Sequence, residues 1–200
     1  GCGVVTGVGA VINTAKASEE DSVAIVGLGG VGLSALLASI AIGSKKTIAI
    51  DLSDEKLALA KELGANHTLN PKDENFLETF LDITSGGANI AVETAGSGHA
   101  LKTAYDITRR GGTTVAAGMP GPKVEITLSH LSIAAEERVI KGSYMGSCIA
   151  QRDIPKYLDM FQTGKLPVDR LLSRKIKFED LNEAMDRLDD AKTVREVLIP

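Results

Sequence analysis

Short apolar runs alternate with longer segments of helical periodicity along most of this chain. Ser22–Val26 (SVAIV) is a continuous apolar run followed by glycine, which is typical of a strand buried on both faces. Val31–Ile42 follows as an apolar helix, and Thr47–Asp51 (TIAID) is predicted as the next strand. Asp54–Leu63 is predicted as a helix, because it begins with acidic residues and Gly64 follows its end.

The same alternation continues to the end of the chain. Further strands are expected at His67–Leu69, Asn89–Glu93, Gly112–Ala117, Val139–Tyr144 and Thr193–Ile199. Further helices are expected at Asn75–Thr84, Gly98–Ile107, Arg152–Thr163 and Phe178–Asp190. Alternating strands and helices with short connections predict an α/β fold, in which a doubly wound parallel sheet of the Rossmann type carries helices on both faces.

Composition narrows the class of protein without naming it. The 200 residues are 44% hydrophobic but only 4% aromatic, so the core must be built from aliphatic side chains. The net charge of -4 gives no electrostatic reason to bind nucleic acid or an anionic membrane, and no uninterrupted apolar run is long enough to span one. Cys2 and Cys148 are too few for a disulfide framework, so we expect a reduced, cytoplasmic setting.

A glycine-rich turn between the first strand and the helix that follows it carries the first chemical signal. It has the pattern G-x-G-x-x-G and consists of Gly27, Leu28, Gly29, Gly30, Val31 and Gly32. Gly27 would allow the tight turn, Gly29 would let the backbone approach a pyrophosphate, and Gly32 would let the helix pack on the strand. The N-terminus of the helix would then offer unpaired N–H groups to the phosphates.

An acid at the end of the next strand supplies the second signal. Asp51 lies about 20 residues beyond the glycines, where a carboxylate can accept hydrogen bonds from an adenosine ribose. It would also repel a 2′-phosphate, by about 4 kcal/mol at most for like charges about 4 Å apart at an effective dielectric of about 20. Lys56, one helical turn later, could reach a ribose oxygen. We therefore predict binding of NAD in preference to NADP.

A dinucleotide site alone does not identify a reaction, and both a dehydrogenase and a non-catalytic nucleotide-sensing module fit it. The Tyr-x-x-x-Lys pair of short-chain dehydrogenases is absent, because none of the three tyrosines has a lysine at that spacing. The spaced glycines and Asp51 fit a pyrophosphate better than they fit a methyltransferase. The histidines, His67, His99 and His130, are more simply interpreted as surface or capping residues.

Eight segments together resemble the zinc-dependent alcohol dehydrogenases of the medium-chain family. In chain order they are GCGVVTGVGAVINTAKA, GLGGVG, DLSDEK, KELGANHTLNP, VETAGSG, GGTTVAAGMP, IKGSYMG and TVREVLIP. The resemblance extends over essentially the whole chain and implies the coenzyme domain and C-terminal tail of such an enzyme, without its N-terminal catalytic domain. It divides the chain into a linking helix (1–18), a dinucleotide-binding domain (19–145) and C-terminal helices with a closing strand (146–200).

The resemblance assigns a role to the cysteine near the start of the chain. Cys2 matches the third protein ligand of the catalytic zinc, while the other two ligands, a cysteine and a histidine, belong to the catalytic domain. Arg195 matches an arginine that pairs with the pyrophosphate. Residues matching those at the nicotinamide end are Thr6, the loop of Ala117, Gly118 and Met119, and the loop of Ser143, Tyr144 and Met145.

The function implied is hydride transfer between an alcohol–aldehyde pair and NAD in a zinc-containing enzyme. We expect the isolated chain to bind NAD without catalysing turnover. The resemblance also implies a homodimer or homotetramer that pairs through residues 124–145. The alternatives are a zinc-free quinone or enoyl reductase of the same superfamily, against which Cys2 argues, and a stand-alone NAD-binding domain.

Overall fold

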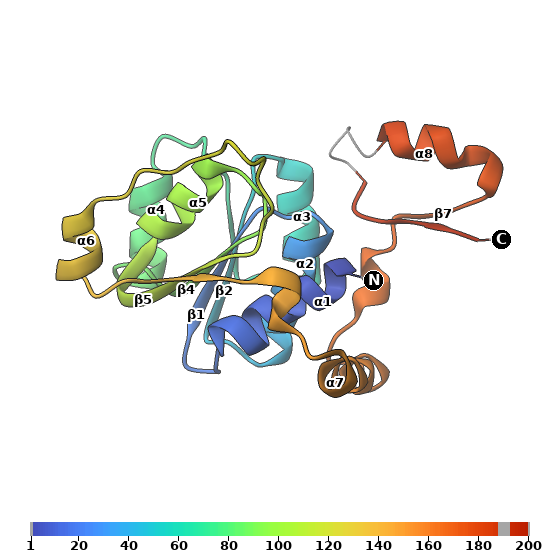
Figure 1. Cartoon of the computed structure of the whole chain (residues 1–200), viewed down its shortest axis with the longest axis horizontal. Helices are drawn as coiled ribbons and strands as arrows, with labels where there is room; N and C mark the ends of the chain where they lie inside the picture. Colours follow the sequence, from blue (N-terminus) through green and yellow to red (C-terminus); the bar gives the residue numbers. More distant parts are fainter. Residues whose placement is uncertain (1, 188–192, 200) are drawn as a thin grey trace.

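Six strands form one parallel sheet in the computed structural model, which describes residues 2–187 and 193–199 (Figure 1). Their order is β3-β2-β1-β4-β5-β6, so the chain winds outward in both directions from β1 and β4. This is the doubly wound order of Rossmann folds, and the predicted fold class is confirmed. The strands are β1 (Ser22–Val26), β2 (Lys46–Ile50), β3 (His67–Leu69), β4 (Ala88–Glu93), β5 (Thr108–Ala116) and β6 (Val139–Gly142).

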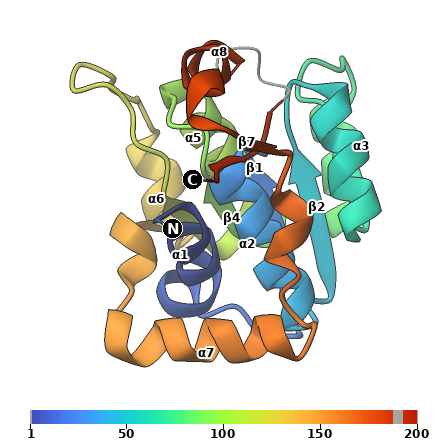
Figure 2. The ribbon, with the colours of Figure 1, turned by 90° about the vertical axis from the view of Figure 1, so that its right-hand side faces the viewer.

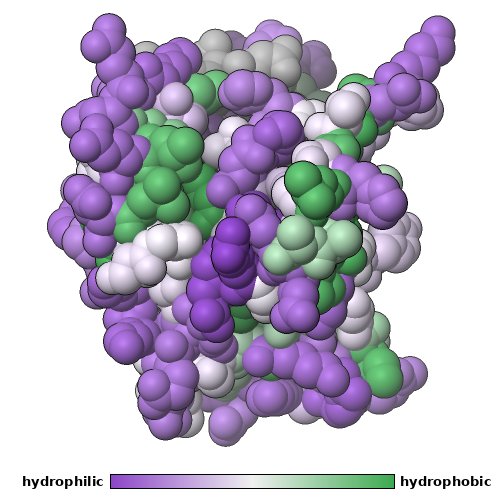
Figure 3. Space-filling view, turned by 90° about the vertical axis from the view of Figure 1, so that its left-hand side faces the viewer, coloured by the Kyte–Doolittle hydropathy of each residue, from purple (hydrophilic) through white to green (hydrophobic). Residues whose placement is uncertain are grey.

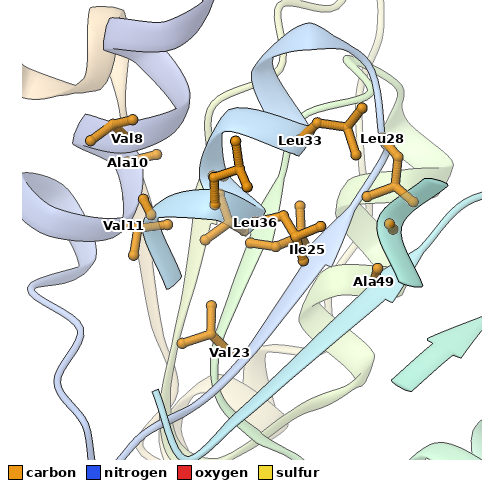
Figure 4. Close-up of a cluster of buried hydrophobic side chains, with 14 of the residues drawn as sticks. Val8, Ala10, Val11, Val23, Ile25, Leu28, Leu33, Leu36 and Ala49 are labelled. Carbon is orange, nitrogen blue, oxygen red and sulfur yellow. The ribbon is translucent and has the colours of Figure 1, made fainter. Parts of the chain in front are cut away.

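Helices cover both faces of the sheet. Successive strand residues point to opposite faces, and the apolar side chains on each face pack against the helices that cover it. Val23 and Ile25 of β1 pack into a core cluster with α1, α2 and α3, part of which is drawn in Figure 4. Ala24 and Val26 point the other way and pack with α4 and α5. The helices are α1 (Cys2–Gly9), continued by the π-helical turn η1 (Ala10–Ala15), α2 (Gly30–Ala41), α3 (Asp54–Leu63), α4 (Phe76–Thr84) and α5 (Gly98–Asp106).

The interior of the sheet is mostly aliphatic, as the composition predicts. All five residues of β1 are buried, and Ile25 has no exposed surface. Truncation of a fully buried isoleucine to alanine typically costs about 2–5 kcal/mol. The centre of the sheet is therefore a rigid platform for the loops at the ends of its strands.

The C-terminal part of the chain lies beside this sheet and does not extend it. Helix α7 (Ala150–Gln162) runs across the end of α1, and a separate two-stranded parallel sheet joins β7 (Arg174–Ile176) to β8 (Glu196–Leu198) (Figure 2). The predicted closing strand is thus present in shorter form. Its partner β7 was not predicted, because two of its three side chains are charged.

Two helical predictions differ from the structure. A short helix, α6 (His130–Ala135), was not predicted, because none of its residues is buried and it shows no apolar periodicity. The predicted helix Phe178–Asp190 is a 3-10 turn, η4 (Phe178–Asp180), followed by α8 (Leu181–Arg187), and its last three residues lie outside the described residues. Within the described ranges, no helix combines the length and apolar character needed to cross a membrane.

Candidate cofactor site

The turn Gly27–Gly32 joins β1 to α2 at the carboxyl end of the sheet. A β-carbon built on Gly32 would lie 1.8 Å from the carbonyl oxygen of Gly27, so no other residue fits there without moving the backbone. A β-carbon on Gly29 would meet nothing within 4 Å, so this side of the turn is open. Gly29 is also the N-cap of α2 and offers no side chain, so the first N–H groups of the helix stay available to an anion.

Asp51 is bonded directly to this turn. Its Oδ2 accepts a hydrogen bond from the N–H of Leu28 at 2.6 Å, and its Oδ1 accepts one from the N–H of Ser53 at 2.9 Å. Each carboxylate oxygen keeps a second lone pair, so the group can still accept hydrogen bonds from two hydroxyls. The two halves of the predicted motif therefore form one structural unit at the ends of β1 and β2.

A cavity of about 360 Å³, which we call the Asp51 cavity, opens beside this carboxylate. Asp51 and Lys56 line one part of it, as the sequence predicts for a ribose site. His99 and Thr103 of α5 also line it, although His99 was interpreted as a surface or capping residue. The contribution of α5 was missed because it depends on the strand order and not on spacing along the chain.

A second, mostly apolar cavity of about 600 Å³ lies between α1, α7 and the C-terminal segment that carries Arg195. Cys2, Met145 and Arg195 all line this Cys2 cavity, together with side chains of α7. Thr6 lies close by, with its Oγ1 4.0 Å from the Sδ of Met145. Three residues that the resemblance assigns to the zinc and nicotinamide end, and Arg195, which it assigns to the pyrophosphate, are thus brought together from distant parts of the chain.

Arg195 reaches the glycine turn from the C-terminal segment. A β-carbon built on Gly30 would lie 3.6 Å from Nη2 of Arg195, which places the guanidinium beside the start of α2. Ser173 anchors the backbone at this point, because its Oγ accepts hydrogen bonds from the N–H groups of Val194 and Arg195 at 3.0 and 3.2 Å. The position of Arg195 suits a contact with phosphate oxygens at the turn.

The next residue along the chain, Glu196, holds the same segment from its other side. Arg187 of α8 donates two hydrogen bonds to its carboxylate, at 3.0 and 2.9 Å. These hydrogen bonds hold the pKa of Glu196 below its usual value. The C-terminal segment is therefore held by side-chain contacts on both sides of Arg195.

The two loops predicted at the nicotinamide end follow β5 and β6. Ala117 is buried, the N–H of Gly118 donates to the carbonyl of Glu93 at 3.0 Å, and Met119 is 77% exposed. In the second loop, Tyr144 is 77% exposed as well. Met119 and Tyr144 are therefore free to contact a ligand or another part of a larger protein.

Ser143 has less freedom than its neighbours. Its N–H donates to the carbonyl of Ala116 at 2.9 Å, and its Oγ lies 2.8 Å from Oγ1 of Thr14. Its N–H and its hydroxyl oxygen thus both make hydrogen bonds within the protein. The N–H of Ser143 is therefore not available to a ligand in this structure, while the predicted contact of the loop 143–145 with the nicotinamide end stays a prediction.

A buried polar network, which the sequence did not predict, ties η1 to α7. Nδ2 of Asn13 lies 3.1 Å from Oδ2 of Asp153, 3.0 Å from the hydroxyl of Tyr157 and 3.2 Å from the carbonyl of Gly146. Burial raises the pKa of Tyr157 to about 12. Hydrogen bonds from Arg152 hold the pKa of Asp153 far below its usual value. The network fixes the helix that carries Cys2 against the loop that carries Met145.

Cys2 is the predicted zinc ligand, and it is exposed at the edge of its cavity. Across residues 2–187 and 193–199, no three His, Cys, Asp or Glu side chains gather closely enough to hold a metal ion. A catalytic zinc site requires three protein ligands. Cys2 can supply one of these, so the described residues alone do not make a zinc site.

Comparisons with known proteins agree with this geometry. A model of the zinc-binding dehydrogenase family matches residues 30–163. Geraniol dehydrogenase of Castellaniella defragrans is 36% identical over 100% of this chain and 53% of its own length, and alcohol dehydrogenase class-2 isozyme 2 of Oryctolagus cuniculus is 35% identical over the same shares. The crystal structure of benzyl alcohol dehydrogenase from Acinetobacter calcoaceticus superposes with a TM-score of 0.95 at 33% identity, over 99% of this chain and 54% of that one.

The sheet order and the glycine turn define a Rossmann-type α/β domain. The chain belongs to the zinc-binding dehydrogenase family, because the family model covers most of its length. The resemblance seen in the sequence is thereby confirmed. The chain spans about half the length of the curated relatives it matches.

Proposed function

We propose that this chain is the coenzyme-binding half of an NAD-dependent, zinc-containing alcohol dehydrogenase that transfers a hydride between an alcohol–aldehyde pair and NAD. The observation that carries the proposal is the 2.6 Å hydrogen bond from Leu28 to Asp51, because it joins a ribose-binding acid to an open helix N-terminus. Relatives named geraniol, alcohol and benzyl alcohol dehydrogenase support the reaction class.

The residues present fit the parts of the coenzyme in order. The N–H groups at the start of α2 and the guanidinium of Arg195 would hold the pyrophosphate, and Asp51 with Lys56 would hold the adenosine ribose. Thr6 and the loops 117–119 and 143–145 would contact the nicotinamide end, which accepts the hydride when the coenzyme is bound. Asp51 would disfavour the additional phosphate of NADP.

Cys2 would supply one zinc ligand in the same enzyme. A thiolate is a suitable ligand for zinc, and its place in the Cys2 cavity puts it on the same side as Met145 and Arg195. The remaining ligands would come from the half of the relatives' length that this chain does not match. We also propose a division of the chain into residues 1–18, 19–145 and 146–200. We propose a reducing, cytoplasmic setting in which neither cysteine forms a disulfide.

A second copy of the chain is the proposed protein partner, through residues 124–145. Strand β6 is an edge of the sheet, and Leu131 is 75% exposed while Val139 and Ile140 are each 40% exposed. Figure 3, which faces the α6 end of the molecule, shows hydrophobic side chains gathered in patches between polar ones. An open strand edge with apolar neighbours favours pairing of two sheets into a dimer or tetramer.

Isothermal titration of the purified chain with NAD and NADP tests the proposed function. We expect NAD to bind more tightly than NADP, and we expect no turnover of a simple alcohol by this chain alone. Equal affinity for the two coenzymes would contradict the role of Asp51. No binding of either would contradict the proposal as a whole.

A further inference from the structure

Glu93 ends β4 in the middle of the sheet, and only 2% of its surface is exposed. It is flanked in register by Val26 of β1 and Ala116 of β5. A carboxylate is costly to bury unless it is paired or hydrogen-bonded. Among the residues that the structure describes, no cation lies within ion-pair distance of it. The chain therefore places an acid where a hydrophobic residue would be the simpler choice.

Backbone N–H groups at the neighbouring strand ends are the partners of this carboxylate. The N–H of Gly96 donates to its Oε1 at 2.6 Å. Burial raises the pKa of Glu93 above its usual value, and the neighbouring backbone N–H groups, first among them that of Gly96, act in the opposite direction. The carboxylate thus holds the loop after β4, while the main-chain carbonyl of the same residue accepts hydrogen bonds from Ala117 and Gly118 in the loop after β5, at 2.9 and 3.0 Å.

The loop after β4 in turn supports the glycine turn. Oγ1 of Thr94 donates a hydrogen bond to the carbonyl of Gly27 at 2.7 Å. A β-carbon built on Gly27 would lie 2.8 Å from the backbone nitrogen of Ala95, so the two backbones are in direct contact. A displacement of residues 94–97 would therefore be felt at the pyrophosphate side of the site.

The loop after β5 rests on the same group. A β-carbon built on Gly118 would lie 2.2 Å from the nitrogen of Gly96 and 2.7 Å from Oε1 of Glu93. Met119, which is predicted at the nicotinamide end, follows directly. The backbone of loop 117–119 is therefore in direct contact, at Gly118, with both the carboxylate of Glu93 and the loop that this carboxylate holds.

We propose that Glu93 is a positioning residue, whose buried carboxylate holds the loops 94–97 and 117–119 in place so that the nicotinamide half of the coenzyme site is formed before the coenzyme binds. This inference rests on the proposed function. The adenosine half has further supports of its own, because Leu28 and Asp51 are bonded to each other and the N–H of Gly27 donates to the carbonyl of Ile50 at 2.8 Å, although Ala95 and Ser97 of loop 94–97 also line the Asp51 cavity.

The substitution Glu93→Gln tests this role, because it keeps the size of the side chain but turns an amide donor toward backbone donors. We expect the affinity for NAD to fall roughly tenfold, as for the loss of one hydrogen bond to a charged group. The affinity for AMP should fall by less, because Ala95 and Ser97 form only part of the Asp51 cavity. The unfolding temperature should not fall, since the variant no longer buries a charge. Glu78→Gln, at an exposed acid in the first turn of α4 and outside both cavities, is the control and should change neither affinity.

Unchanged affinity for NAD in the Glu93 variant would overturn the inference, and so would equal losses for NAD and AMP together with a lowered unfolding temperature. If Glu93→Gln does not fold, Glu93→Asp keeps the charge but lacks the reach to Gly96. It should then reduce the ratio of NAD to AMP affinity, and an unchanged ratio would overturn the inference. Failure of the unmodified chain to bind NAD would instead contradict the proposed function, and this inference with it.

Discussion

The Asp51 cavity and the Cys2 cavity are held together by different kinds of contact. The Asp51 cavity is formed by loops at the ends of neighbouring strands, and short bonds to backbone groups fix it, such as Leu28 to Asp51 at 2.6 Å. The Cys2 cavity is formed by α1, α7 and the C-terminal segment, which meet from distant parts of the chain. There the fixing contacts are made by side chains, including Ser173 and Asn13.

This difference predicts how the two halves of the site respond to change. The adenosine half should persist as long as the sheet is folded, because its walls are the ends of core strands. The nicotinamide half should be lost more easily, because it depends on contacts that can break while the sheet stays intact. Binding of AMP and of NAD separates the two halves experimentally, since AMP occupies only the first.

The largest expected effect comes from Gly32→Val, which should displace the backbone of the glycine turn beside the Asp51 cavity. Its β-carbon would lie 1.8 Å from the carbonyl of Gly27, and both groups belong to the backbone of a packed turn. We expect a loss of about 3 kcal/mol in the free energy of unfolding and no detectable binding of AMP or NAD. Urea denaturation and calorimetric titration measure the two effects.

Gly29→Ala is the matched control for that substitution. Nothing lies within 4 Å of its β-carbon, so the stability should change little. A methyl group there would still obstruct the approach of a pyrophosphate, so NAD should bind more weakly than it does to the unmodified chain. Unaltered NAD affinity would show that the pyrophosphate does not lie against Gly29.

Asp51→Asn should have the next largest effect and should act on both ligands. The loss of hydrogen bonds to a charged acceptor is worth about 1.5–3 kcal/mol, so the affinities for AMP and NAD should both fall by about 10- to 100-fold. The preference for NAD over NADP should narrow at the same time, because the like-charge repulsion is removed. Glu55→Gln, an exposed acid in the first turn of α3, should leave all three affinities unchanged.

Arg195→Gln should separate the two halves of the site. The guanidinium lies beside Gly30 and lines the Cys2 cavity, so NAD affinity should fall by about tenfold. AMP affinity should fall by less, because AMP carries only one of the two phosphates and the Asp51 cavity does not include this residue. Arg174→Gln, an exposed neighbour in β7, is the control. Equal losses for AMP and NAD would contradict the division into two halves.

The smallest expected effect occurs only at alkaline pH and concerns the hydrogen-bond network of Asn13, Asp153 and Tyr157. The pKa of Tyr157 is raised from 10.0 to about 12, chiefly by burial. Its contribution to stability is therefore fully present below pH 10 and is lost as the pH rises toward 12. Tyr157→Phe should flatten the fall in unfolding temperature over this range, and an unchanged fall would contradict the burial of this hydroxyl.

The sequence alone predicts the residues of the Asp51 cavity better than those of the Cys2 cavity. The glycine turn and Asp51 could be predicted because each lies next to a strand whose apolar run is visible in the sequence. Arg195 was identified only through the resemblance, since nothing local brings it to Gly30. Its approach requires β7, whose charged residues do not resemble a strand.

Glu93 and Asn13 show what the sequence could not reveal. Glu93 is a lone acid at the end of an apolar strand, and its partners are backbone N–H groups that only the packed loops bring to it. Asn13 acquires its partners from α7, far away along the chain. A charged residue at the end of a buried strand, such as Glu93, can at least be marked in the sequence as unusual. A polar residue within a helix, such as Asn13, cannot.

A crystal structure of this chain with NAD bound tests the central claim most directly. The account predicts the pyrophosphate on the N–H groups of the first turn of α2, the adenosine ribose on the carboxylate of Asp51, and the adenine ring in the Asp51 cavity. Coenzyme bound at any other place, or a ribose that leaves Asp51 without contact, would contradict it.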